Sequence, residues 1–273
     1  MSEVIVIEPK KGWIPVNLRE IWKYRELLYF LAWRDIKVKY KQTALGIIWA
    51  VLQPVLAMLI FTVLFGRFAG MPSDGAPYPI FVYIGLLPWN YFAAVLGLST
   101  NSLVSGANLI SKVYFPRIII PASSAIAALL DLVIGSVVLG VLMVYYGVHL
   151  SSGILLVPVL IFITLMNAIG FGIWFSALNV RYRDIQYAIP FLIQIWMFAT
   201  PVIYPKTLLE GQWGWLLLLN PMSGVIEAFR PAVLGHLPIP WQALGISTAV
   251  GLFVFLSGIF YFRRVERHFA DVI

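Results

Sequence analysis

The chain has 273 residues, of which 61% are hydrophobic and 11% are charged, with a mean hydropathy of +0.90. About a quarter of the residues are charged in a typical soluble domain, so this composition excludes an ordinary soluble protein. A net charge of +7 is compatible with nucleic-acid binding, but the basic residues flank long apolar runs, where membrane topology explains them better. The absence of cysteine excludes disulfides and thiolate metal sites.

The first 33 residues form a polar N-terminal region, in which we expect no secretory signal peptide, because no apolar run precedes a small-residue cleavage site. Residues 17–33 predict an amphipathic helix, which Asn17 caps and in which Glu20 resembles the second member of a capping box. We expect this helix to lie in the membrane interface. A soluble stub packed on the loops is the alternative.

Six stretches of about 20 residues or more are almost free of charge, and each is long enough to cross the roughly 30 Å hydrocarbon core as a helix. They lie at 44–66, 79–104, 118–146, 154–178, 186–204 and 242–262. Lipid offers no partner to backbone polar groups, so each stretch is expected to be one helix. The sequence therefore predicts an all-α integral membrane protein, with a transmembrane domain over 34–264 and a cytoplasmic tail over 265–273.

The segment 205–241 is also apolar, but it is interrupted. Its run Trp213–Leu219 is too short to cross a bilayer, and Asn220, Pro221 and, further along, Arg230 interrupt the segment that follows. We expect short re-entrant helices here, between the fifth and sixth spans.

The distribution of Lys and Arg predicts the orientation. With six spans and the N-terminus inside, sixteen of the 19 basic residues face the cytoplasm and three face outside. Counting 213–235 as another full span would place the C-terminal arginines outside, against the positive-inside rule. Both termini are therefore expected in the cytoplasm.

Motifs for common enzyme chemistry are absent from the sequence. There is no Gly-Lys-Ser/Thr phosphate loop and no Gly-x-Ser-x-Gly elbow, the three histidines are scattered, and the acidic residues do not form metal-binding pairs. We therefore expect no catalytic residue and no metal site. A membrane-embedded enzyme of glycan or lipid assembly and a purely structural subunit are the alternatives.

Asp131 is an acidic residue inside the predicted span 118–146, where an unpaired charge costs several kcal/mol. No Lys or Arg lies within any predicted span, so we expect Asp131 to hydrogen-bond a neighbouring helix, with a relay or pore-lining contact as the alternative. Trp33, Tyr40 and Trp49 lie near the start of the first span, and aromatic faces stack on sugar rings. Together with Asp131, they are the pore or gate candidates.

Residues 105–117 form a connection of mixed polarity that ends shortly after Pro116. They predict one or two helical turns. Such turns either contact a cytoplasmic partner or serve only as a plain connecting loop.

Three patches carry a resemblance to a known family. The first is Arg34-Asp35-Ile36-Lys37 with Tyr40-Lys41-Gln42, Leu45-Gly46 and Trp49, and the second is Lys112-Val113-Tyr114-Phe115-Pro116-Arg117 followed by Pro121. The third is Asn179-Val180-Arg181-Tyr182-Arg183-Asp184, followed by Thr200-Pro201-Val202-Ile203-Tyr204-Pro205 and Asn220-Pro221-Met222. These patches resemble the permeases of ABC-2-type transporters, most closely the polysaccharide and polyol-phosphate exporters.

The resemblance implies a homodimer that works with two separate ATPase subunits in the bacterial inner membrane. ATP and Mg²⁺ would bind those subunits, and this chain would bind no cofactor and no nucleic acid. The implied cargo is a lipid-linked polysaccharide such as an O antigen. A teichoic-acid-like polyol phosphate and a small lipophilic compound are the alternatives, and the lack of Lys and Arg in the spans favours a neutral glycan.

The resemblance also implies which residues couple the permease to ATP hydrolysis. The segment 105–117 would be the coupling helix, seated in a groove of the ATPase, and the turn around 181–184 would close the cytoplasmic face. The coupling candidates are Asn108, Leu109, Ser111, Lys112, Tyr114, Arg117, Arg181, Arg183 and Asp184.

Overall fold

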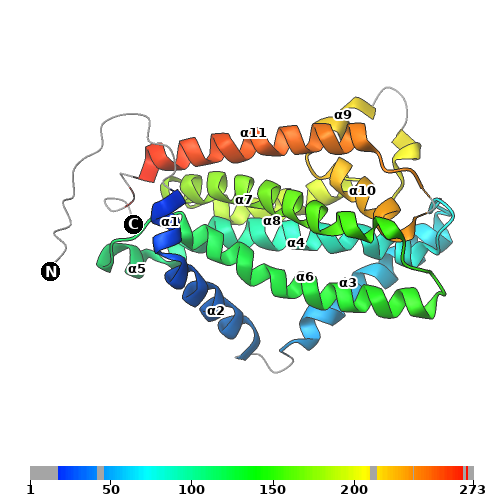
Figure 1. The fold of residues 1–273 in the computed structure, drawn as a ribbon, viewed down its shortest axis with the longest axis horizontal. Coiled ribbons are helices and arrows are strands. Elements are labelled where there is room, and N and C mark those ends of the chain that lie inside the picture. Colours follow the sequence, from blue (N-terminus) through cyan, green and yellow to red (C-terminus); the bar gives the residue numbers. More distant parts are fainter. Residues whose placement is uncertain (1–17, 42–45, 210–213, 236, 267–268, 270–273) are drawn as a thin grey trace.

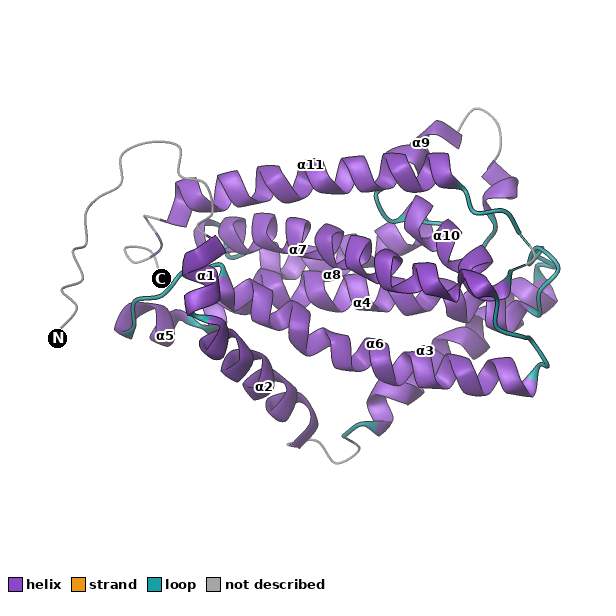
Figure 2. Cartoon of the chain, in the orientation of Figure 1, coloured by secondary structure: helices purple, strands orange, loops and turns teal. Residues whose placement is uncertain are grey.

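A computed structural model describes residues 18–41, 46–209, 214–235, 237–266 and 269. Within these ranges every regular element is a helix, and short loops join the helices (Figure 2). Most of the long helices run roughly along one common axis and form an elongated bundle (Figure 1). The prediction of an all-α membrane fold is confirmed.

In the part of the chain that the structure describes, five helical stretches are long and apolar enough to cross a membrane. They are α3 (Ile48–Phe61) continued by the π-helix η1 (Thr62–Phe68), α4 (Tyr78–Ser105), α6 (Ile119–Tyr145), α7 (Val157–Arg181) preceded by the 3-10 turn η2 (Ser152–Leu156), and α11 (Trp241–Glu266). Their ends lie within about four residues of five predicted spans, because in lipid the apolar run and the helix coincide.

The remaining predicted span, 186–204, contains the shorter helix α8 (Ile185–Phe198). Its 14 residues reach about 21 Å, which is less than the roughly 30 Å hydrocarbon core. Proline disfavours helical backbone in the residue before it, and Pro201 and Pro205 follow the helix closely. The prediction of one helix up to residue 204 is therefore wrong for its last six residues, which form a turn.

Short helices occupy the segment between α8 and α11, as predicted. They are η3 (Lys206–Leu209), α9 (Gly214–Leu219) and α10 (Ser223–Leu234). All twelve residues of α10 are buried, and the helix packs against α4, α7 and α11. It ends at Gly235, whose positive φ of 76° suits glycine and reverses the chain direction.

Two helices precede the bundle: α1 (Leu18–Lys23) and α2 (Arg25–Lys41). The single helix predicted over 17–33 is interrupted at Tyr24, and its second part continues to Lys41, so the expected domain boundary between 33 and 34 falls inside α2. Its predicted cap, Asn17, lies outside the described residues. Leu31 and Ala32 are buried, and α2 packs against α6. The helix α3 follows α2 along the chain (Figure 1).

The central helix of the bundle is α4, which buries most of its apolar length and packs mainly against α6 and α7. Hydroxyl groups bind it to α6: Tyr83 donates to the carbonyl of Gly135 at 3.1 Å, and Ser99 donates to that of Pro121 at 3.0 Å. Such bonds satisfy polar groups in a region without water.

Positive charge gathers at one end of the bundle, which we call the basic end. Its basic residues include Lys112, Arg117, Arg181, Arg183, Arg263 and Arg264. Here the short helix α5 (Ala107–Lys112) joins α4 to α6, on the same side as α1 and the C-terminal end of α11 (Figure 1).

A second hydrophobic core lies at the basic end, separate from the main core of the bundle; we call it the basic-end core. It joins side chains from α2, α4, α5, α6, α7 and α11. Its buried members are Leu31, Leu103, Ile110, Phe115, Ile118, Ile119, Ile120, Ile173, Ala177, Val180, Phe262 and Phe269. The elements at this end are therefore packed as one unit.

Candidate functional site

A cavity of about 400 Å³ lies among α2, α3, α4 and α6, and we call it the polar cavity. Three of the four predicted pore or gate residues line it: Tyr40, Trp49 and Asp131. The other lining residues are Lys39, Gly46, Ala50, Gln53, Pro54, Tyr83, Leu87, Asn90, Tyr91, Ala93, Ala94, Leu132 and Gly135. Residues that are far apart in the sequence thus form one site.

Asp131 is held at the rim of this cavity by two groups from α2. The ammonium group of Lys39 lies 2.5 Å from Oδ2, and the hydroxyl of Tyr40 donates to Oδ1. The expected hydrogen bond to a neighbouring helix is present, and Asp131 also has a basic partner although no Lys or Arg lies within a span. The partner lies outside the spans, because α2 reaches beside the middle of α6.

The hydrogen bond also affects Tyr40. Burial and the hydrogen bond to Asp131 raise the pKa of Tyr40 well above its ordinary range. The hydroxyl therefore stays protonated and acts as a donor to the carboxylate. The cavity combines the Lys39–Asp131 ion pair with two side-chain amides and four aromatic rings, so it offers binding groups for a hydroxyl-rich solute.

Trp33, the fourth pore or gate candidate, lies apart from the cavity. It lines a shallow groove on α2 with Phe30, Arg34 and Lys37, and the ammonium group of Lys37 lies 5.5 Å from the Trp33 ring. The Trp33 side chain is half exposed. Aromatic and basic side chains on one exposed face are typical of a helix in the membrane interface.

The predicted coupling segment divides into an exposed part and an anchored part. Asn108, Ser111, Lys112 and Tyr114 are exposed at the tip of the basic end, and Leu109 is half-buried. Arg117 is different, because its backbone N–H donates to Oε1 of Glu266 at 3.2 Å and its guanidinium donates to the Glu266 carbonyl.

The other three coupling candidates, Arg181, Arg183 and Asp184, are exposed in the turn between α7 and α8. A buried residue that sequence reasoning did not select, Asn179, holds this turn. Its amide donates to the carbonyl of Thr100 at 3.1 Å, and its oxygen accepts the N–H of Gln186 at 3.2 Å. The signal was available, because an amide inside an apolar helix needs partners.

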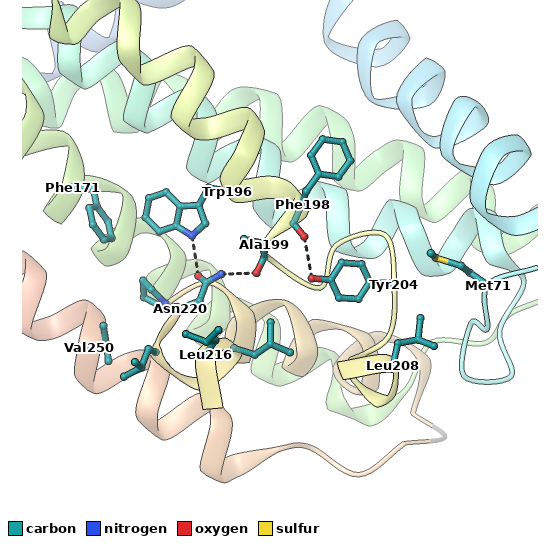
Figure 3. Close-up of a pocket in the computed structure, with 13 residues that line it drawn as sticks. Met71, Phe171, Trp196, Phe198, Ala199, Tyr204, Leu208, Leu216, Asn220 and Val250 are labelled. Carbon is teal, nitrogen blue, oxygen red and sulfur yellow. Dashed lines mark hydrogen bonds between the residues drawn. The ribbon is translucent and has the colours of Figure 1, made fainter. Parts of the chain in front are cut away.

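The opposite end of the bundle contains an apolar cavity of about 920 Å³ between α8, α9 and α11 (Figure 3). Asn220 forms its polar centre. The side-chain oxygen of Asn220 accepts from the Trp196 indole at 3.1 Å, and its amide donates to Thr200 Oγ1 at 2.8 Å and the Ala199 carbonyl at 3.3 Å. The Asn220-Pro221 and Thr200-Pro201 pairs of the sequence thus meet in space.

Arg230 on α10 supports the same turn, although sequence analysis treated it only as an interruption. Its Nη2 donates to the carbonyls of Pro201 and Val202, at 2.8 and 2.9 Å. These carbonyls have left the helix α8 and lack its hydrogen bonds. A lone arginine within an apolar segment was the signal for such a role.

The described residues contain no group of three or more His, Cys, Asp or Glu side chains that could hold a metal ion. The side-chain clusters described above, around Asp131, Asn179 and Asn220, consist of hydrogen-bonded polar groups and aromatic rings. Their arrangement suits binding and conformational coupling.

Comparisons with known proteins show which proteins this chain is similar to. The O-antigen export system permease protein RfbA of Myxococcus xanthus is 33% identical over 261 residues, which cover 94% of this chain and 98% of the relative. RfbA of Klebsiella pneumoniae is 26% identical over 249 residues, 91% of this chain and 95% of the relative. The polysialic acid transport protein KpsM of Escherichia coli is 26% identical over 232 residues, 82% and 88% of the two chains.

These relatives are named for transport and not for catalysis, in agreement with the prediction of a transport subunit. The family described as ABC-2 type transporter matches residues 26–234, from the first turn of α2 to the end of α10. The match covers the polar cavity, the coupling segment and the turn held by Arg230, so the chain belongs to the ABC-2 type transporter family.

Proposed function

We propose that this protein is the permease of an ATP-driven exporter that moves a lipid-linked polysaccharide of the O-antigen type across the bacterial inner membrane. The similarity to an O-antigen export permease over 94% of the chain carries the proposal. The relative named for polysialic acid transport also handles a sugar polymer, which supports the cargo class.

The basic end faces the cytoplasm in this proposal, with both termini on that side. Its arginines and lysines support this orientation through the positive-inside rule. The length of α4 supports it as well: 28 residues reach about 42 Å, roughly 12 Å more than the hydrocarbon core. The excess falls at the basic end, where the exposed polar residues Asn101 and Ser105 lie in the last turns of α4, so α5 projects beyond the lipid.

Two copies of the chain work with two separate ATPase subunits, which bind ATP and Mg²⁺. The missing phosphate loop supports a separate ATPase. The exposed face of α5, with Ser111 and Lys112, is the surface on which the ATPase acts. For ATP binding to drive transport, each nucleotide state must bind one permease conformation better than the other.

The polar cavity contributes to the path of the polymer. Trp49 offers an aromatic face, and Gln53 and Asn90 offer amides, which hold hydroxyl groups without covalent chemistry. The charges of Asp131 and Lys39 compensate each other. The cavity is therefore polar but has no strong electric field that would attract or repel an ionic cargo.

The first experiment is purification of the tagged chain from its native membrane in mild detergent, with mass spectrometry of co-purifying subunits. An ATPase with a Gly-Lys-Ser/Thr loop in a two-plus-two complex is the expected result. Deletion of the chain in its host tests the cargo. We expect loss of surface polysaccharide and accumulation of the lipid-linked polymer inside the cell, and unchanged surface polysaccharide would refute the proposed cargo.

A further inference from the structure

The C-terminal end of α11 is fastened to the coupling segment through Glu266. Both the backbone N–H and the guanidinium of Arg117 donate to this residue, one to its carboxylate and one to its carbonyl. Arg263, one turn earlier on α11, contacts the other carboxylate oxygen at 3.4 Å. Glu266 thus joins two arginines from separate elements, in bonds that are stronger than neutral ones because they carry charge.

Phe269 adds an apolar contact to this joint. Its side chain is fully buried, and its ring lies edge-on to Phe262, with 5.3 Å between the ring centres. The guanidinium carbon of Arg117 lies 5.9 Å from the Phe269 ring. Phe269 belongs to the basic-end core together with Ile110 of α5 and Phe115, so it packs within the same core as the coupling segment.

The coupling segment needs such support because it is short. α5 has six residues, and an isolated helix of that length is unstable in water. Ile110 is its one buried residue, while Ser111, Lys112 and Tyr114 point to the exterior. Its orientation is therefore set by the contacts of Ile110 and of α4 together with those that follow it, at Phe115 and Arg117.

We propose that Glu266 and Phe269 are positioning residues for the coupling segment, and that the C-terminal end of α11, with Phe269, is part of the machinery that receives the ATPase. They hold Arg117, and through it residues 107–117, in the orientation in which the ATPase meets them. This inference rests on the proposed function. It also implies that a displacement of α5 is passed to α11 directly, in addition to α4 and α6.

The first test uses the purified permease alone and measures hydrogen exchange of peptides that cover 107–117. Glu266→Gln removes the carboxylate charge that accepts the Arg117 backbone N–H and contacts Arg263, and Phe269→Ala removes the ring. We expect exchange about tenfold faster in both variants. Phe269→Leu is expected to retain slow exchange, and Arg264→Gln, an exposed neighbour on α11, serves as the matched control.

The second test uses the permease–ATPase complex. The chain has no cysteine, so Ser111→Cys introduces a single thiol for cross-linking to the ATPase. In this background, Glu266→Gln and Phe269→Ala are expected to lower the cross-link yield and the polymer exported per ATP hydrolysed, each about tenfold. The amount of assembled complex should stay close to that of Arg264→Gln.

The outcomes separate the two claims. Unchanged exchange in both variants would show that Glu266 and Phe269 do not hold the coupling segment. Faster exchange with unchanged cross-linking and export would overturn the positioning role. Equal losses of cross-link yield and of export in Phe269→Leu and Phe269→Ala would overturn it as well. Absence of any cross-link from Ser111→Cys in the otherwise unaltered complex would contradict the proposed coupling surface. The exchange experiment on the permease alone would still show whether Glu266 and Phe269 hold the coupling segment.

Discussion

The guanidinium carbon of Arg230 lies 3.6 Å from the centre of the Phe81 ring, so α10 places a cation against the central helix α4. The same guanidinium donates to the carbonyls of Pro201 and Val202. A broken helix inside a membrane exposes carbonyls that water cannot reach, and here an arginine satisfies them. The break after α8 and the short helix α10 therefore depend on each other.

Replacement of Arg230 should destabilise the protein strongly. Arg230→Leu leaves two buried carbonyls without donors, and we expect a loss of about 2–5 kcal/mol in the free energy of unfolding. Thermal unfolding in detergent measures the effect. Arg67→Leu is the control, because Arg67 is exposed at the same end of the bundle. Equal melting temperatures for the two variants would contradict the role of Arg230.

The Lys39–Asp131 pair should show energetic coupling. Both side chains retain some exposure, 49% and 22%, so we expect a coupling energy of about 0.5–1 kcal/mol in a double-mutant cycle with Lys39→Gln and Asp131→Asn. The exchanged pair Lys39→Asp with Asp131→Lys should recover part of the export that each single change removes. Additive losses in the cycle would show that the pair does not hold α2 to α6.

Two glycines of α11 should respond differently to alanine. A Cβ on Gly258 would lie 2.7 Å from the carbonyl oxygen of Gly170, which belongs to α7 and cannot move aside cheaply. We expect Gly258→Ala to cost about 1–3 kcal/mol of stability. Gly245 has open space around it, so Gly245→Ala should be neutral or stabilising by up to about 1 kcal/mol. Melting temperatures that fall equally in both would refute close packing of α7 and α11.

The stability of the protein should depend on the side-chain amide and oxygen of Asn220. Asn220→Leu removes the bonds to Trp196, Thr200 and Ala199 at once, and we expect a loss of about 2–4 kcal/mol. Asn220→Asp keeps an acceptor for the Trp196 indole, so it should be milder. The measurement is thermal unfolding followed by Trp fluorescence. An Asp variant as unstable as the Leu variant would contradict the hydrogen bond from Trp196.

Charge reversal on the exposed face of α5 should uncouple transport without unfolding the bundle. Lys112 is exposed, and Lys112→Glu changes only the surface that we propose the ATPase contacts. We expect transport-coupled ATP turnover to fall about tenfold, because like charges in an interface are repulsive. Arg264→Glu is the control at the same end. Normal turnover in Lys112→Glu, with assembled complex, would count against α5 as the coupling surface.

Most of the secondary structure was predictable because a bilayer restricts the options. An apolar run in lipid must become a helix, so five predicted spans agree with the structure to within about four residues. The exception, α8, ends early because of Pro201 and Pro205. Those prolines were visible in the sequence, but the broken helix is stable only because Arg230 binds the freed carbonyls.

The amino-acid sequence by itself determined the membrane class, the positions of the long helices, the concentration of basic residues and the family resemblance, since each follows from local composition or short motifs. Only the tertiary structure decided which polar residues meet. Lys39 lies outside every span yet pairs with Asp131, Glu266 reaches Arg117, and Trp33 stays away from the cavity. Such pairings depend on how helices pack at long range, which no local pattern in the chain encodes.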